Sequence, residues 1–98
     1  MLDVGTIANI ARKAATKHLE KGSVERVESE PATDSDGNDA LRITLVLKPH
    51  TADTLDGDSV LDTLVAIQRE LREAGEDRFP IVEYATQEEL EADADPQP

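Results

Sequence analysis

One stretch of strictly alternating character constrains the fold of this chain more than any other feature. Residues 40–48 have the sequence ALRITLVLK, in which Leu41, Ile43, Leu45 and Leu47 occupy every second position. Successive side chains of a strand point to opposite faces, so these four residues form one aliphatic ridge. The pattern therefore predicts a strand with one buried face, and other elements must cover that face.

Two segments have the periodicity of amphipathic helices that can cover the ridge. Residues 6–21 repeat apolar residues at three- and four-residue steps, with Asp3 or Thr6 as the cap of the helix start. Gly22 follows where a helix often ends. A second helix is expected to begin at Ser59 and to end at Gly75. Its apolar stripe consists of Val60, Leu64, Ile67, Leu71 and Ala74, widened by Leu61.

Two further strands are expected. Residues 23–30 contain two valines among charged residues, which favours a strand at the edge of a sheet. The turn-forming residues 31–39 connect it to the alternating strand as a hairpin. Residues 79–84 form a third strand, in which Pro80 cannot donate a ladder hydrogen bond. The chain therefore contains a small sheet of three strands.

The order of these elements defines the fold class, an α+β two-layer sandwich with the order α-β-β-α-β and two helices on one face of a mixed sheet. Thr86 and Glu89 form a capping box for a short last helix over about residues 87–92. A right-handed crossover through the second helix leaves the second and third strands parallel, either as neighbours or with the first strand between them. We expect one domain over residues 1–92 and a disordered tail over residues 93–98.

The order of elements resembles that of RNA-binding domains of the K-homology type in their second topology. Such domains clamp a nucleic-acid backbone with a Gly-x-x-Gly loop. That loop is missing here, because Gly57 and Gly75 have no glycine partner at the required spacing. The resemblance concerns the topology alone, and it implies no RNA-binding function.

The charge of the chain bears on its partners. The net charge is −12, and five of the 22 acidic residues precede residue 31, which leaves 17 in the remainder. Phosphate backbones repel such a surface, so direct binding of nucleic acid is not expected. Solubility, or a host with high internal salt, explains the acidity. A functional explanation of the acidity is that the acidic surface binds a basic protein partner.

Composition argues against several functional classes. There is no cysteine, which excludes a disulfide framework, a thiolate metal site and a cysteine nucleophile. The serines lie in strand, loop or cap contexts, and no glycine-rich phosphate loop is present, so we expect neither an enzyme nor a bound cofactor. No stretch approaches the roughly 20 apolar residues of a membrane span, and the amino terminus lacks a signal-peptide pattern. We therefore expect a cytoplasmic protein.

One loop collects possible metal ligands. His50, Asp53, Asp56 and Asp58 precede the second helix, and an imidazole with carboxylates can hold zinc or manganese. Catalytic zinc usually has more nitrogen or sulfur ligands, and aspartates at a helix start are also explained by capping. A second acidic segment, residues 34–39, lacks the glycine and glutamate of a calcium loop and is better interpreted as a turn.

The face of the sheet opposite the aliphatic ridge is the candidate interaction surface. Arg42, Thr44 and Val46 lie on it, and Val82 or Tyr84 can join them in a partly apolar patch. We expect a small, non-catalytic, acidic protein that binds another protein through this patch, the second helix or an edge strand. The same patch can close a homodimer. The alternatives are an acidic inhibitor that substitutes carboxylates for nucleic-acid phosphates toward a basic protein, and a weak metal- or small-ligand-binding protein.

Overall fold

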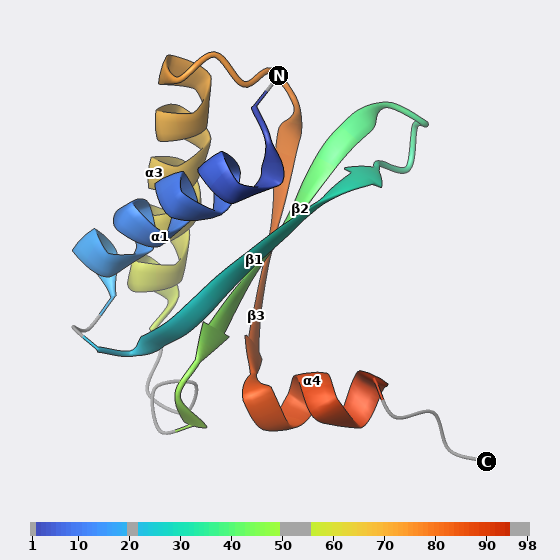
Figure 1. The fold of residues 1–98 in the computed structure, drawn as a ribbon. Helices are drawn as coiled ribbons and strands as arrows, with labels where there is room; N and C mark the ends of the chain where they lie inside the picture. The colour runs from blue at the N-terminus through green and yellow to red at the C-terminus, as the bar shows by residue number, and fades with distance from the viewer. Residues whose placement is uncertain (1, 20–21, 50–55, 95–98) are drawn as a thin grey trace.

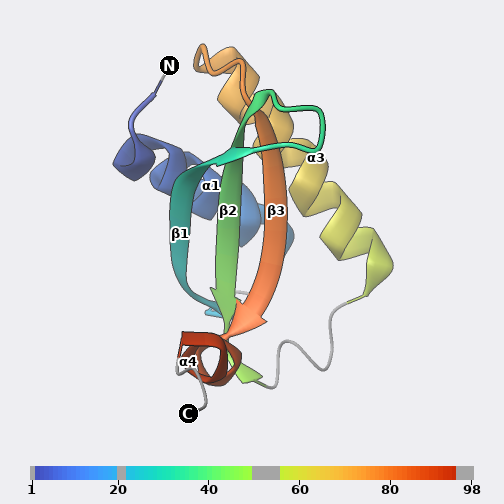
Figure 2. The same ribbon diagram turned by 90° about the vertical axis from the view of Figure 1, so that its right-hand side faces the viewer.

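The computed structural model describes residues 2–19, 22–49 and 56–94 of the 98-residue chain. The elements are α1 (Val4–His18), β1 (Val24–Thr33), β2 (Asp39–Leu47), α3 (Gly57–Glu73), β3 (Phe79–Thr86) and α4 (Gln87–Ala94). Figures 1 and 2 show α1 and α3 on one face of a three-stranded sheet, with the other face free of both. The predicted two-layer α+β sandwich is confirmed.

β2 is the central strand of the sheet. It pairs antiparallel with β1 and parallel with β3, in the order β1-β2-β3. The predicted parallel pairing of the second and third strands is therefore confirmed, and the first strand does not lie between them. The ridge residues of β2, which are Leu41, Ile43, Leu45 and Leu47, are fully buried. They pack with Ile7, Ala11 and Ala14 of α1 and with Ala66, Ile67 and Leu71 of α3.

Capping aspartates set the start of both long helices. The Asp3 carboxylate accepts a hydrogen bond from the Thr6 backbone N–H at 2.7 Å, so α1 begins at Val4 and not at residue 6. The Asp56 carboxylate accepts from the Ser59 backbone N–H at 2.7 Å, so α3 begins two residues before Ser59. The predicted start at Ser59 is therefore too late, because Asp56 is the residue that caps the helix.

The β1–β2 hairpin is longer than predicted and its loop is shorter. β1 continues through Pro31 to Thr33, because an edge strand tolerates a residue without a backbone N–H. In the connecting turn, the Asp34 Oδ1 accepts from the backbone N–H groups of Asp36 and Asn38, both at 2.9 Å. Gly37 has a φ of +87°, which a glycine adopts without strain. The Asp34 carboxylate therefore holds residues 34–39 in a turn.

The capping box at the end of β3 is confirmed. The Thr86 backbone N–H donates to Glu89 Oε1 at 3.0 Å, and the Glu89 N–H donates to Thr86 Oγ1 at 3.2 Å. α4 follows and runs to Ala94, and residues 95–98 of the expected tail lie outside the described residues. α4 projects from the end of the sheet on the side away from α1 and α3 (Figure 1).

Candidate protein-interaction surface

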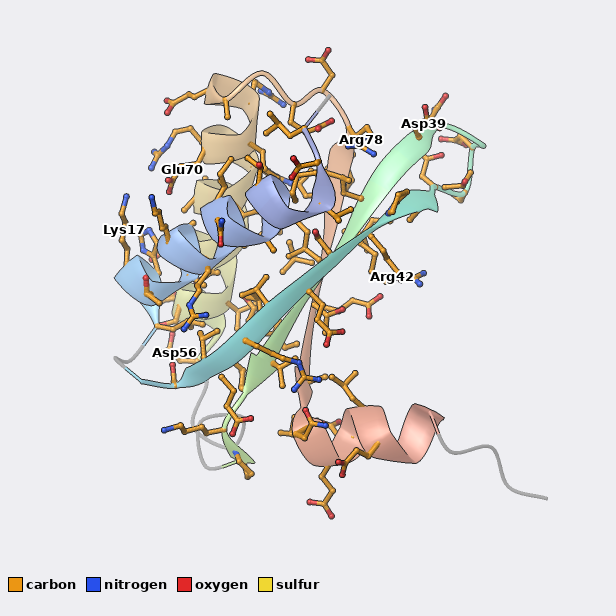
Figure 3. All side chains as sticks on the ribbon, viewed as in Figure 1. Lys17, Asp39, Arg42, Asp56, Glu70 and Arg78 are labelled. Atoms are coloured by element: carbon orange, nitrogen blue, oxygen red, sulfur yellow. The ribbon has the colours of Figure 1, made fainter. Side chains whose placement is uncertain are left out.

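The middle of the open sheet face is a ladder of charged side chains. Arg42 of β2 points away from the helices (Figure 3) and lies between Glu30 of β1 and Glu83 of β3, with N–O distances of 3.2 Å to each. Glu30 is the register partner of Arg42 on β1, and Glu83 is the register partner of Thr44 on β3. Exposed pairs of this kind contribute little to stability, but they leave the open face with few uncompensated charges.

Arg42 and Thr44 lie on the open face as predicted, whereas Val46 is not available there. Val46 has 0% exposed surface, although it projects from the face opposite the ridge. Its neighbour Arg26 on β1 hydrogen-bonds to the side chain of Gln87 at the start of α4, and α4 projects outward from this end of the sheet (Figures 1 and 2). The expected contribution of Val46 to an exposed patch is therefore wrong.

Val82 and Tyr84 lie on the opposite face from the one expected. In the parallel register, Val82 is level with Ile43 and Tyr84 with Leu45, so both side chains point toward the helices. The Tyr84 hydroxyl donates to the Val60 carbonyl of α3 at 3.3 Å, and burial raises the pKa of this phenol. Placing these two residues in the open-face patch was wrong because the alternation of β3 has the opposite phase.

The predicted metal loop is only partly described. His50 and Asp53 lie outside the described residues. Asp56 is used as the cap of α3, where its second oxygen also lies 3.3 Å from the Ser59 hydroxyl, and Asp58 is exposed in the first turn. Within residues 2–19, 22–49 and 56–94, no group of three or more histidine, aspartate or glutamate side chains is placed to hold a metal ion.

The outer face of α3 carries the largest exposed aliphatic pair on a described helix. Leu61 and Val65 are 58% and 50% exposed, and they lie one turn apart on the side of α3 that faces away from the core. A shallow groove of about 530 Å³ continues along the same side, lined by Val65, Gln68, Arg69, Arg72 and Glu73. We call the set Leu61, Val65, Gln68, Arg69 and Arg72 the α3 outer face.

The sequence pattern contained a signal for this surface that the prediction did not use. Leu61 was expected to widen the buried stripe, but it is exposed. At about 100° per residue, Leu61 lies about 120° around the helix axis from the buried Ile67, and Val65 lies about 160° from it. Both residues are thus outside the sector that the sheet and α1 can cover.

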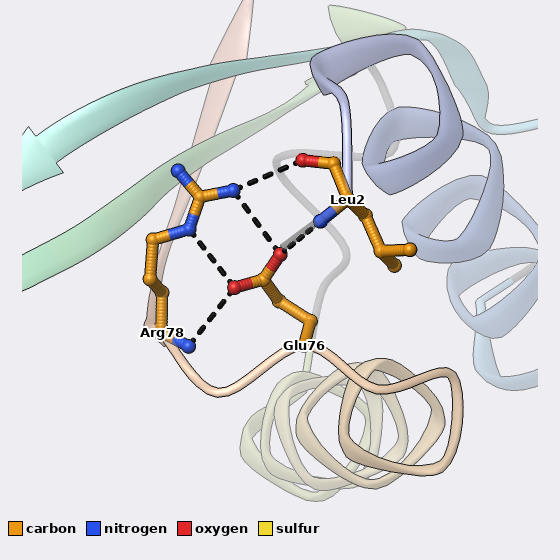
Figure 4. Close-up of polar contacts among 3 residues, drawn as sticks. All are labelled: Leu2, Glu76 and Arg78. Carbon is orange, nitrogen blue, oxygen red and sulfur yellow. Dashed lines mark hydrogen bonds and ion pairs between the residues drawn. The ribbon is translucent and has the colours of Figure 1, made fainter.

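The most strongly perturbed carboxyl group among the described residues belongs to a buried ion pair. Glu76 is 3% exposed, and its two oxygens accept hydrogen bonds from the Leu2 backbone N–H at 2.8 Å and from Arg78 Nε at 2.9 Å (Figure 4). Arg78 Nη2 also donates to the Leu2 carbonyl at 3.0 Å. The Arg78 hydrogen bonds lower the pKa of Glu76 from 4.5 to about 2. The pair joins the amino terminus to the loop between α3 and β3, which is a structural role.

This low pKa gives the stability of the fold a defined dependence on pH. A carboxyl group with a lowered folded-state pKa stabilises the fold above its ordinary pKa of 4.5, and the contribution is lost as the pH falls from that value to about 2. Urea unfolding of the protein and of the Glu76→Gln variant across this range checks the effect. We expect the stability difference between the two proteins to shrink as the pH falls, and a constant difference would contradict this assignment.

Comparisons with known proteins leave the chain without a family assignment. No family model matches the sequence, no curated protein is similar to it, and no solved structure matches its fold. In the described part of the chain, no helix has both the length and the apolar character needed to cross a bilayer.

Proposed function

We propose that this protein is a non-catalytic protein-binding module of the cytoplasm that engages its partner through the α3 outer face. The observation that carries the proposal is the exposure of two neighbouring aliphatic side chains, Leu61 and Val65, beside a groove whose lining includes two arginines and Glu73. Water-exposed aliphatic pairs next to arginines resemble the centre of protein interfaces, where apolar anchors and arginine are enriched. The surface lies on α3, whose opposite side packs into the core through Ala66, Ile67 and Leu71.

Two carboxyl groups with lowered pKa values have structural roles, which supports a non-catalytic function. The Asp3 pKa is lowered by the backbone hydrogen bond from Thr6, which belongs to the cap of α1. Glu76 is engaged by Arg78 and Leu2. Both carboxylates therefore serve the structure, and neither has the raised pKa of a general acid that works near neutral pH.

The acidic-inhibitor function is a second candidate, and α4 is the feature that favours it. Its sequence QEELEADA contains four acidic residues and no basic one. The open sheet face gives less support, because Arg42 compensates Glu30 and Glu83 there. An inhibitor of this kind would bind a basic protein through α4 and would lose it steeply as salt is added.

A photo-crosslinking amino acid at position 65 tests the proposed function in a lysate of the source cell. A matched variant carries the same group at Lys13, which is exposed on α1. We expect position 65 to yield a stoichiometric adduct that survives high salt, and position 13 to yield none. The Val65→Glu substitution in an otherwise unmodified protein should then abolish co-purification of the same partner. A basic partner lost at high salt and unaffected by Val65→Glu would favour the acidic inhibitor, and no adduct at position 65 would overturn the proposed function.

A further inference from the structure

The charge pattern of α3 identifies an occupant for its outer face. We infer that this face binds the same face of a second copy of the chain, with the two α3 helices antiparallel and a twofold axis passing close to Val65. The inference rests on the proposed function, because it names the partner of the surface proposed there.

The spacing of charges about Val65 is symmetric. Asp58 precedes Val65 by seven residues and Arg72 follows it by seven, and all three are exposed. Seven residues correspond to about 10.5 Å along a helix and to about two full turns, so the three side chains lie on one side of α3. In an antiparallel pair centred on Val65, Asp58 of one copy lies level with Arg72 of the other. The twofold axis repeats this contact, as an isologous interface requires.

The residues four positions from Val65 complement each other in the same arrangement. Leu61 lies on one side of Val65 and Arg69 on the other. Leu61 of each copy then meets the aliphatic stem of Arg69 from the other copy. The guanidinium of this Arg69 extends toward Asp62 of the copy that contributes the leucine, and Asp62 is exposed on the flank of the helix. The centre of the contact is formed by two valines. The interface therefore has an aliphatic middle with opposite charges at both ends.

The net charge of −12 does not prevent this contact. Asp58 and Asp62 balance Arg69 and Arg72 on this side of α3, and Glu73 in the groove leaves a single excess negative charge there. Charges farther than about 8 Å away are screened at physiological salt. The open sheet face lacks such complementarity for a second copy, because Arg26 and Arg42 on it are already paired with glutamates of the same chain. One helix face is a small interface, so the dissociation constant should be on the order of tens of micromolar.

Sedimentation equilibrium tests the dimer, and variants that reverse the charge at Asp58 or at Arg72 test its geometry. We expect the unmodified protein to shift from monomer to dimer between about 5 and 500 µM in about 0.15 M salt. Asp58→Arg places like charges at both ends of the contact, and so does Arg72→Asp, so each variant alone should dimerise at least about tenfold more weakly. An equimolar mixture restores an attractive pair at both ends, so the mixture should dimerise as the unmodified protein does. Circular dichroism of each variant verifies that α3 is intact.

The outcomes separate this inference from the proposed function. A protein that remains monomeric at the highest concentration overturns the dimer, and a dimer that the mixture fails to restore overturns the antiparallel arrangement. If the protein is monomeric but position 65 captures a different protein, the proposed function stands without the dimer. If the protein is monomeric and position 65 captures nothing, both fail. A crosslinked product with the mass of two chains supports both.

Discussion

Replacing Glu76 with glutamine is expected to lower the free energy of unfolding by about 3 kcal/mol at neutral pH. The glutamine side chain has the same shape, but it leaves the Arg78 guanidinium, of which 11% of the side chain is exposed, without its counter-charge. It also replaces one of the two acceptor oxygens with an amide nitrogen, so a hydrogen bond from Leu2 or Arg78 is lost.

Chemical denaturation of the two proteins measures this effect. Glu73→Gln is the matched control, because Glu73 is an exposed glutamate at the end of α3, three residues before Glu76, and its substitution should change the stability by less than about 0.5 kcal/mol. Equal effects of the two substitutions would show that the Glu76 pair contributes no more than a surface charge.

Replacing Ile67 with alanine is the second substitution expected to have a large effect, a loss of about 3 kcal/mol. Ile67 is fully buried between α1 and the sheet, in contact with the aliphatic core. Its truncation removes apolar surface from the core and leaves a cavity that the packed helices cannot close.

The control for this substitution lies on the opposite side of the same helix. Val65→Ala should change the stability of the monomer by less than about 0.5 kcal/mol, because Val65 is 50% exposed. Both variants should be measured at a low protein concentration, where self-association adds nothing to the stability. A large loss from Val65→Ala under these conditions would mean that the α3 outer face is covered within a single chain.

The fold could be predicted from the sequence because its signals are local and periodic. The alternation over residues 40–48 predicted the buried strand, and helical periodicity predicted both covering helices. The Thr86 and Glu89 pair predicted α4 because a capping box needs only residues three positions apart. Both helices begin two residues before the predicted start, since the choice between capping residues three positions apart depends on backbone geometry that a sequence pattern does not contain.

The candidate site was harder to predict because exposure depends on distant elements. Val46 is fully buried, and its β1 neighbour Arg26 bonds to Gln87, which lies more than 40 positions after Val46 in the chain. The phase of β3 decides where Val82 and Tyr84 point, and a short strand beginning with Phe79 and Pro80 shows no clear alternation. The Glu76 pair was not predicted either, because its partner Leu2 is 74 positions away.

The central position of β2 has a consequence for the order in which the chain folds. β1 and β2 are joined by the short turn at Asp34, so they can pair at a small cost in loop-closure entropy. β3 pairs with β2 across a separation of 39 residues, as between Ala40 and Phe79, and α3 must form within that interval. The hairpin should therefore form before the parallel pairing, and the addition of β3 to β2 should be the slower step of folding.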